Sequence, residues 1–374
     1  MRVILTVSND LSSDQRVRKM CLTLVQKGYD VGVIGRRLAN SADYNPATYA
    51  AHRMTLIFNR GPLFYAELNV RFFIYLLFKK VDIIHANDLD TLLSAWLVSK
   101  IRSKKLVYDT HEYFTGVPEL QNRPFTRKVW KTLERFILPR LTHIITVNDS
   151  IAKLYENEYR LAPIRVIRNI PEANTEIIPA STTLLSRLPQ NKFRLIIQGN
   201  GINIHRGAEE AVEAMQWLSN CCLIIAGSGD VLPLLHQKVE ALNLHERVIF
   251  FDKMPYAELM GLTSSCHLGL SLDKDTNINY RFSLPNKIFD YLRAGIPVLS
   301  SNLPELRKII EQYQVGWFLE AVDNKSLAEK INAIVSDHSH YNLVKEKIPV
   351  AAKQLSWEHE ISALEHIYSE KFNA

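Results

Sequence analysis

The residue types best suited to binding a phosphorylated ligand gather in the second half of the chain. The segment GNGINIHRG follows an apolar run and holds Gly199, Gly201 and Arg206. Glycines let a backbone approach a ligand closely, and both the expected start of a helix and the Arg206 guanidinium favour an anion. A phosphate site is one interpretation, and a tight turn with a solvated arginine is the other. A second glycine turn at Gly227, after LIIA, fits a ligand contact or a bare turn.

A denser set of candidate residues runs through NYRFSLPNKIFDYLRAGIPVLSSNLP, residues 279–304. Pro285 suits the first turn of a helix, which would set Lys287 and Asp290 three residues apart on one face. We expect Lys287 and the start of this helix to face a diphosphate, and the Asp290 carboxylate to accept hydrogen bonds from a ribose diol. A solvated Lys–Asp pair is the competing interpretation, which the Arg206 loop in the same half disfavours.

Polar groups also follow apolar runs in the first half. VYDTHE places His111 beyond an expected strand, where it would contact a sugar or its phosphate, with a structural histidine as the alternative. The opening loop SNDLSSDQRVRK supplies Asp10, Asp14 and Arg16 as acceptor-side candidates. Two Asp-x-Asp pairs, in NDLD and in DKD, lack a third hard ligand nearby, so we expect no metal site.

The elements that must position these groups alternate along both halves. Short β-rich runs separated by helical patterns are typical of βαβ units and parallel sheets. We expect strands over 3–7, 31–34, 83–85, 106–108, 144–147, 165–167, 193–198, 223–226, 248–251, 268–271, 298–300 and 317–319. The proline-containing stretch 169–190 interrupts the alternation and is typical of a domain connector. This predicts two doubly wound α/β domains whose facing strand ends bind substrate.

Charge is divided unevenly over the 374 residues. The net charge of +6 splits into 27 basic and 17 acidic residues over 1–190, against 18 and 22 over 191–374. Within the basic half, RPFTRKVWKTLERFILPR (123–140) forms a basic amphipathic helix pattern. Such a helix lies on an anionic membrane or packs with a solvated basic face. With no recognised binding motif beside the charge, we expect no nucleic-acid partner.

Composition and apolar runs limit the remaining classes. With 47% hydrophobic and 22% charged residues, the chain has the composition of a globular protein. The apolar run 72–78 is far too short to span a bilayer, and MRVILTVSND lacks a cleavage pattern, so we expect a cytoplasmic protein. The cysteines show no metal-binding spacing and are expected to be buried thiols rather than disulfides; they are Cys21, Cys221, Cys222 and Cys266.

Taken together, these segments resemble the retaining GT-B glycosyltransferases of family four (group 1) over nearly the whole chain. The strongest match is PNKIFDYLRAGIPVLSSNLPEL; supporting segments are GNGINIHRG, IIAGSGD, RVIFFDKMPYAELMGLTSSCHLGL, DQRVRKMCLTLVQKGYDV, VYDTHEYF and LSWEHEISALEHIY. The resemblance implies a Rossmann-like acceptor domain over 1–185, a Rossmann-like donor domain over 186–355 and a C-terminal helix, 356–374, that crosses back to the first domain.

The resemblance also assigns roles to individual residues. Asp290 corresponds to the acid that binds the nucleotide ribose, Arg206 to the basic residue on the diphosphate, and His111 to the histidine near the transferred sugar. Residues 254–259 fall where the family packs the base. The catalytic candidates are His111, Arg206 and Lys287; the donor-binding candidates are Gly199, Gly201, Arg206, Gly227, Ser283, Leu284, Asn286, Lys287 and Asp290.

Three positions depart from the family pattern, and the first is Asp290 itself, where the family more often has a glutamate. Phe282 stands eight residues before Asp290, where the family has a first acid, and Asn200 stands where an arginine is common. We expect Asn279, Arg281 and Ser283 to substitute for the sugar contacts. Lys287 would supply the second cation on the phosphates.

The activity implied is transfer of a hexosyl-type sugar from a UDP- or GDP-sugar to a lipid-linked or polysaccharide acceptor, in the synthesis of surface glycans such as lipopolysaccharide. No cofactor or metal is expected, because cations and backbone amides would neutralise the leaving diphosphate. A basic acceptor domain would also fit peripheral contact with the inner face of an anionic membrane. The alternatives are a GT-B nucleotide-sugar epimerase and a non-catalytic nucleotide-sugar-binding partner.

Overall fold

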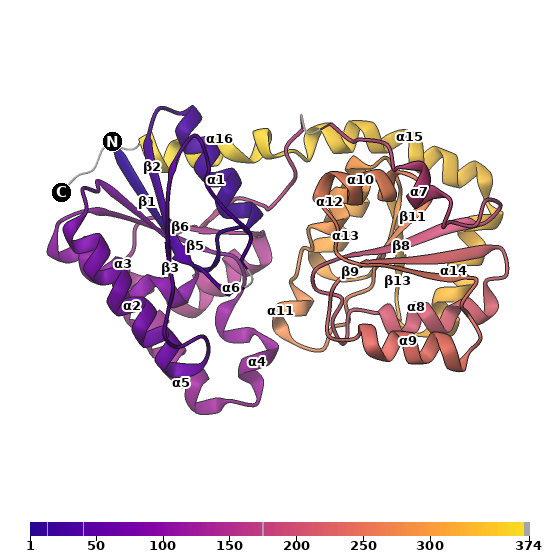
Figure 1. The fold of residues 1–374 in the computed structure, drawn as a ribbon, viewed down its shortest axis with the longest axis horizontal. Coiled ribbons are helices and arrows are strands. Elements are labelled where there is room, and N and C mark those ends of the chain that lie inside the picture. Colours follow the sequence, from indigo (N-terminus) through magenta and orange to yellow (C-terminus); the bar gives the residue numbers. More distant parts are fainter. Residues whose placement is uncertain (13, 40, 174–175, 370–374) are drawn as a thin grey trace. The chain divides into compact units, whose positions relative to one another are not determined.

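A computed structural model describes residues 1–12, 14–39, 41–173 and 176–369. The chain forms two compact units, one of residues 1–169 with the C-terminal segment from Glu360, the other of residues 170–359. Each unit has its own sheet with helices on both faces (Figure 1). The α/β architecture predicted from the alternating pattern is confirmed.

The first unit is built on a seven-stranded parallel sheet in the order β3-β2-β1-β4-β5-β6-β7. Its strands are β1 (Arg2–Asp10), β2 (Asp30–Arg36), β3 (Ala50–Met54), β4 (Ile83–Asn87), β5 (Lys105–Thr110), β6 (Ile144–Thr146) and β7 (Arg165–Val166). The sequence pattern predicts all of these except β3. That strand reads AAHRM and pairs with β2 at the sheet edge, so it needs no apolar run.

Helices cover both faces of this sheet. On one face α2, α3 and α5 lie together, whereas α1 and α16 contact each other on the opposite face through Lys27 and Glu365 (Figure 1). Asp14 caps α1, and Gly28 at φ +82° ends it as predicted. The helices are α1 (Gln15–Gln26), α2 (Gly61–Phe78), α3 (Leu89–Ile101), η1 (Phe114–Gly116), α4 (Pro118–Gln121), α5 (Pro124–Ile137), η2 (Leu138–Arg140), α6 (Asp149–Tyr159) and α16 (Trp357–Ser369).

The second unit is built on a six-stranded parallel sheet in the order β10-β9-β8-β11-β12-β13. Every strand predicted for this half is present: β8 (Phe193–Gly199), β9 (Cys221–Gly227), β10 (Val248–Phe251), β11 (Leu268–Ser271), β12 (Val298–Ser301) and β13 (Gly316–Leu319). They are nearly continuous apolar runs, as expected for strands covered on both faces.

The helices of the second unit pack in two apolar clusters, one on each side of the sheet. They are α7 (Thr182–Leu185), α8 (Ala208–Ala214), η3 (Met215–Trp217), α9 (Leu232–Ala241), α10 (Tyr256–Ser264), α11 (Ile278–Arg281), α12 (Lys287–Arg293), α13 (Pro304–Tyr313), α14 (Asn324–Ser336) and α15 (His338–Gln354). All four cysteines are buried free thiols, as the sequence predicts.

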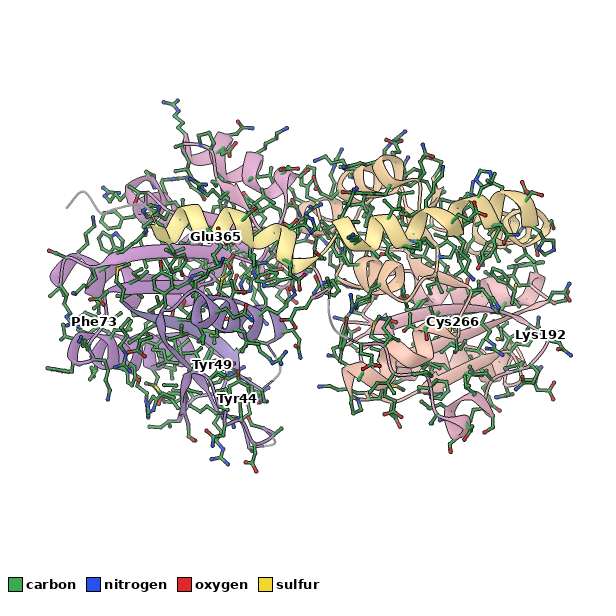
Figure 2. The ribbon with its side chains drawn as sticks, turned by 90° about the horizontal axis from the view of Figure 1, so that it is seen from above. Tyr44, Tyr49, Phe73, Lys192, Cys266 and Glu365 are labelled. Atoms are coloured by element: carbon green, nitrogen blue, oxygen red, sulfur yellow. The ribbon has the colours of Figure 1, made fainter. Side chains whose placement is uncertain are left out.

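The division between the units falls before Ile170, earlier than the boundary expected after residue 185. Ile170 is fully buried in the apolar cluster of the second sheet, and Leu184 and Leu185 pack against the same cluster. The expected connector therefore belongs largely to the second unit. At the other end, α16 returns to the first unit, where Tyr368 packs on Tyr29 and Glu365, labelled in Figure 2, pairs with Lys27 of α1.

Candidate functional site

Two glycine-rich loops leave neighbouring strands of the second sheet and are joined to each other. After β8, the carbonyl of Gly199 accepts a hydrogen bond from Ser228 N at 3.0 Å, and Ile202 N donates to Ser228 O at 3.1 Å. Gly227 has φ +135°, and a Cβ there would overlap the Gly199 carbonyl oxygen. A Cβ on Gly229 would likewise overlap the Ile202 carbonyl oxygen. Glycine is therefore required at the second loop because the two backbones touch.

The first loop places Arg206 beside the buried carboxylate of Asp273. Gly207, at φ +76°, packs so closely on Leu272 that any Cβ would overlap it, and this contact sets the loop against the end of β11. Arg206 Nη1 lies 3.2 Å from Asp273 Oδ1, and the guanidinium stacks over the Tyr280 ring with its carbon 4.9 Å from the centroid. The predicted phosphate-binding arginine is thus held on one side by a carboxylate and on another by an aromatic face.

Lys287 approaches the same carboxylate from α12. Its Nζ lies 3.9 Å from Asp273 Oδ2, while its side chain is 11% exposed. Burial lowers the pKa of Lys287, the Asp273 charge opposes that shift, and Arg206 adds to it. Asp273 is fully buried, and neither of its oxygens accepts a hydrogen bond from the described residues. The structure therefore brings together the two predicted cations around one acid.

Asp290 lies on the same helix as Lys287 but contacts Tyr256 and Gln198 instead of Asp273. Its Oδ1 accepts a hydrogen bond from Tyr256 Oη at 2.7 Å, and its Oδ2 accepts one from Gln198 Nε2 at 3.4 Å. Gln198 is in turn held by the Thr263 hydroxyl. Burial, and then the Asp290 charge, raise the pKa of Tyr256, so its hydroxyl stays a donor. The carboxylate is held by neutral donors, which ribose hydroxyls could match in kind.

The other donor-side candidates lie on the segment between α11 and α12. Ser283 Oγ donates to the Tyr280 carbonyl at 2.9 Å, Leu284 packs against the apolar cluster, and Asn286 precedes α12 with an exposed side chain. Because α12 begins at Lys287, Pro285 lies before the helix rather than in its first turn. A Cβ on Gly201 would meet no atom within 4 Å, so its space is open.

The proposed substitutes for the missing acid differ in exposure. Asn279 is 8% exposed, whereas the Arg281 side chain is 57% exposed and lies 3.9 Å from Asp275. Phe282 is partly buried and lies under the Arg281 guanidinium at 5.9 Å. Of these positions, Asn279 has the burial typical of a binding-site amide.

In the first unit His111 is held between two carboxylates. Its Nδ1 lies 3.2 Å from Asp88 Oδ2, its Nε2 lies 3.8 Å from Asp109 Oδ2, and its backbone N–H donates to Asp88 Oδ1 at 2.9 Å. Burial opposes a charge on the ring, but Asp88 and then Asp109 raise the pKa of His111 to about 9. Asp88 adopts φ +60°, an uncommon conformation for a non-glycine residue. His111 is therefore a cation at neutral pH.

The expected acceptor-side residues have structural partners. Arg16 is 3% exposed and donates to both oxygens of Asp109, at 2.8 and 3.1 Å, and to the Ile167 carbonyl at 2.8 Å. Asp14 accepts from Val17 N as the cap of α1. These contacts tie Arg16 and Asp14 to the fold of the first unit rather than leaving them turned to a ligand.

Asp10, the third acceptor-side candidate, also has partners in the first unit but stays partly exposed. It accepts a hydrogen bond from Arg53 Nη2 at 3.0 Å and one from Ser12 N at 3.1 Å. Although burial opposes it, hydrogen bonds from Ser41 and Ser12 together with the Arg53 charge hold the pKa of Asp10 below its usual value. The carboxylate is ionised and remains partly exposed at the end of β1.

Three polar residues contact the predicted donor-site residues, although the sequence alone did not identify them as part of the site. Asp273 appears there as half of a chance Asp-x-Asp pair, Tyr256 as part of a base-packing segment, and Gln198 as the end of a strand. A polar residue at or just beyond the carboxyl end of a buried strand is the signal for Asp273 and Gln198. Tyr256 has no such signal, because its partner Asp290 lies 34 positions away.

Two features are absent from the described ranges. No group of three His, Cys, Asp or Glu side chains there is arranged to hold a metal ion. No helix in the same ranges is long and apolar enough to cross a membrane.

Family models match both units of the chain. Residues 14–170 match the model described as Glycosyltransferase Family 4, and residues 186–349 match Glycosyl transferases group 1. Among curated proteins, the chitobiosyldiphosphodolichol beta-mannosyltransferase of Candida albicans is 20% identical over 266 residues, 66% of this chain and 58% of that protein. Its Candida glabrata counterpart is 19% identical over 408 residues, 95% and 88% of the two chains.

Solved structures share the fold. Sucrose-phosphate synthase from Thermosynechococcus elongatus superposes with a TM-score of 0.79 at 17% identity, covering 98% of each chain. HepE from Anabaena, solved in complex with UDP, gives a TM-score of 0.73 at 18% identity, covering 99% of this chain and 100% of its own. With two parallel-sheet units and both family models matched, the chain belongs to the family-four, group 1 glycosyltransferases and is an enzyme of the GT-B fold.

Proposed function

We propose that the protein is a retaining glycosyltransferase that moves a hexosyl sugar from a UDP- or GDP-sugar to a lipid-linked or polysaccharide acceptor. The observation that carries the donor assignment is the convergence of Arg206 and Lys287 on Asp273 at the end of β11. Two cations beside one carboxylate leave a net positive charge next to the glycine loops. That charge suits the diphosphate of a nucleotide sugar.

The rest of the donor site extends from this charge. Asp290, held by Tyr256 and Gln198, offers its carboxylate to the ribose diol. Tyr256 belongs to the segment 254–259, which would pack the base beside that carboxylate. The structures of HepE with UDP and with UDP-glucose support a nucleotide-sugar donor by likeness of fold.

For the reaction, we place the developing charge of the leaving diphosphate against Arg206 and Lys287. The bond from the anomeric carbon to the phosphate oxygen breaks while the acceptor oxygen bonds to that carbon on the same face. The acceptor proton passes to the departing phosphate oxygen, so no carboxylate nucleophile is required. This compensation by side chains needs no metal ion. His111, as a cation, would bind a sugar hydroxyl or phosphate near the transferred sugar.

The acceptor assignment is supported by relatives and by charge. WaaG, described as involved in lipopolysaccharide biosynthesis, shares the fold with a TM-score of 0.70 at 15% identity. The curated mannosyltransferases are named for a dolichol-linked acceptor. The first 190 residues carry ten more basic than acidic side chains, which suits a phosphate-bearing lipid carrier at a cytoplasmic membrane surface.

A thermal-shift screen with UDP, GDP, ADP and CMP tests the donor site. We expect one diphosphate to raise the melting temperature, and both Arg206→Ala and Lys287→Ala to abolish the shift. Glu240→Ala, which changes an exposed side chain on α9, is the control and should respond like the wild type. A full response in both site variants would refute the assignment.

Transfer itself is tested with the sugar nucleotide of the base that binds. We expect chelator-insensitive turnover, with the product anomer matching the donor anomer in proton NMR. Interconversion of the sugar without an acceptor would instead indicate an epimerase. Nucleotide binding without turnover on any lipid acceptor would indicate a binding partner.

A further inference from the structure

The loop that follows His111, residues 112–116, is held by buried polar side chains of α5 and α6. It leaves the sheet at the end of β5 and passes into η1. Glu134 of α5 and Tyr155 of α6 lie against it, and both side chains are fully buried. Burying a carboxylate and a phenol costs free energy that their hydrogen bonds must offset. The partners of these bonds therefore show what the two side chains hold in place.

The Tyr155 hydroxyl lies at the centre of these contacts. It accepts a hydrogen bond from Phe114 N at 3.2 Å and donates to the Glu112 carbonyl, 3.3 Å away. The hydroxyl of Thr110, the last residue of β5, donates to the same carbonyl at 2.6 Å. One phenol thus joins two backbone groups of the loop, which lie one and three residues after His111.

Glu134 holds the loop through a side chain. Its Oε2 accepts hydrogen bonds from the Thr115 hydroxyl at 3.1 Å and the Tyr159 hydroxyl at 2.6 Å, and its Oε1 lies 3.4 Å from the Tyr155 hydroxyl. Burial raises the pKa of Glu134, whereas the hydrogen bonds from Tyr159 and Thr115 and the Lys131 charge oppose that shift. Thr115 is therefore fixed by a buried acceptor that several donors satisfy.

The place of the His111 ring depends on the path of this loop. Its nitrogens lie 3.2 Å from Asp88 and 3.8 Å from Asp109, and the side chain keeps 19% of its surface exposed. A group that acts on a bound substrate must be held within about 0.5 Å of its productive position. Strand pairing of β5 with β6 ends at Thr110, so the hydrogen bonds to residues 112–116 supply the constraint on the far side of the histidine.

We propose that Tyr155 and Glu134 are positioning residues for sugar transfer, because they fix the 112–116 loop and thereby keep His111 between its two carboxylates. Both act through the loop, since their hydrogen bonds reach its backbone and the Thr115 side chain. The proposal rests on the proposed function, which places His111 near the transferred sugar.

Tyr155→Phe tests the positioning, because it removes one hydroxyl and keeps the ring that packs in the core. We expect the loop to loosen and the His111 ring to move away from its carboxylates, so that the pKa of His111 falls from about 9 toward about 6.5. NMR of protein with isotope-labelled histidine measures this pKa, and the signal that His111→Gln removes identifies the residue. The charged and titratable groups that face His111 keep their identity in Tyr155→Phe; they are Asp88, Asp109, Asp90, His85 and Arg16.

Tyr159→Phe is the matched control. Its hydroxyl bonds Glu134 and Lys131 rather than the loop. This variant should lower the melting temperature about as much as Tyr155→Phe, while the pKa of His111 stays near 9. Release of UDP or GDP from the saturating sugar nucleotide should slow about tenfold or more in Tyr155→Phe and less than about twofold in Tyr159→Phe. The thermal shift with nucleotide should be unchanged in both.

Thr115→Val is a milder variant that keeps the side-chain shape and removes the bond from the loop to Glu134. It should lower the pKa of His111 in the same direction as Tyr155→Phe, so the test does not depend on one variant that must fold.

An unchanged pKa of His111 in both Tyr155→Phe and Thr115→Val would overturn the proposal. An equal fall in Tyr159→Phe would also overturn it, since lost stability alone would then move the ring. If the pKa fell while turnover stayed complete, transfer would not depend on the ring, and the role of His111 in the proposed function would be wrong. The donor site is measured separately by the thermal shift with nucleotide, so its failure is distinguishable from these outcomes.

Discussion

Asp109 and Asp273 are both fully buried and both lie where a central strand of a parallel sheet ends, but their surroundings differ. Asp109 receives two hydrogen bonds from Arg16, which is itself 3% exposed. Asp273 is approached by Arg206 at 3.2 Å and Lys287 at 3.9 Å, and neither of its oxygens accepts a hydrogen bond from the described residues. The first arrangement is closed on itself, whereas the second keeps two cations at one carboxylate.

That difference separates a structural ion pair from a binding site. Arg16 matches Asp109 in charge and geometry, so the Asp109 carboxylate has no charge left for a ligand. Around Asp273 the cations outnumber the acid, and Arg206 is 28% exposed on its side chain. A diphosphate would supply the missing negative charge. A buried polar cluster is therefore a candidate site when its charges fail to cancel rather than merely because it is charged.

The largest expected effect comes from breaking the closed pair. Arg16→Met leaves Asp109 ionised and buried, which should lower the free energy of unfolding by about 3–5 kcal/mol. Arg206→Met, the matched change at Asp273, should cost about 1 kcal/mol or less, since Lys287 remains and water reaches the loop. Urea unfolding of both variants measures the comparison, and equal losses would remove the distinction between the two acids.

The next effect concerns the backbone that shapes the open cluster. Gly227→Ala puts a Cβ onto the Gly199 carbonyl at a φ of +135°, so strain and overlap together should cost about 2–4 kcal/mol. Gly201→Ala, in the neighbouring loop, meets no atom within 4 Å and should cost under about 1 kcal/mol. Thermal unfolding distinguishes them. A tolerant Gly227→Ala would mean that the loops do not depend on their contact.

A smaller effect depends on pH and involves His111 beside the closed pair. Since Asp88 and Asp109 raise the pKa of His111 to about 9, the ion pair stabilises the fold fully below about pH 6.5 and is lost as pH rises through about 9. Asp88→Asn keeps the side-chain shape and tolerates the positive φ. It should therefore destabilise the protein by about 2–3 kcal/mol at pH 6 and by much less at pH 10. A loss independent of pH would assign Asp88 a purely geometric role.

The sequence predicts more of the fold than of these clusters. Buried strands are visible in the sequence as apolar runs, and twelve of the strands lie where such runs occur. The exception is β3, whose sequence is AAHRM, because an edge strand does not need an apolar run. Arg206 and Lys287 were identifiable from glycine and proline signals around them. Their meeting at Asp273 was not, because it depends on the close packing of Gly207 on Leu272.

The surroundings of α2 and of Arg16 likewise depend on packing that the sequence does not show. The apolar run 72–78 is visible in the sequence, but which of its side chains face outward depends on where α3 and the sheet lie. Arg16 looks like an accessible cation beside Asp14, and only the fold shows that it turns inward to Asp109. Long-range partners decide whether a charged residue is structural or exposed, and sequence spacing does not record them.

The smallest expected effect tests the neutral side of the donor cluster. Asp290→Asn should weaken binding of the preferred nucleoside diphosphate about tenfold, because a charged acceptor for the ribose diol is lost. Tyr256→Phe removes one neutral donor, at 2.7 Å from Asp290 Oδ1, while Gln198 still holds the other oxygen, so the affinity should change less than about threefold. Calorimetry measures both. If Tyr256→Phe weakened binding as much as Asp290→Asn, the hydroxyl itself would be contacting the nucleotide, and Asp290 would serve to position Tyr256 instead.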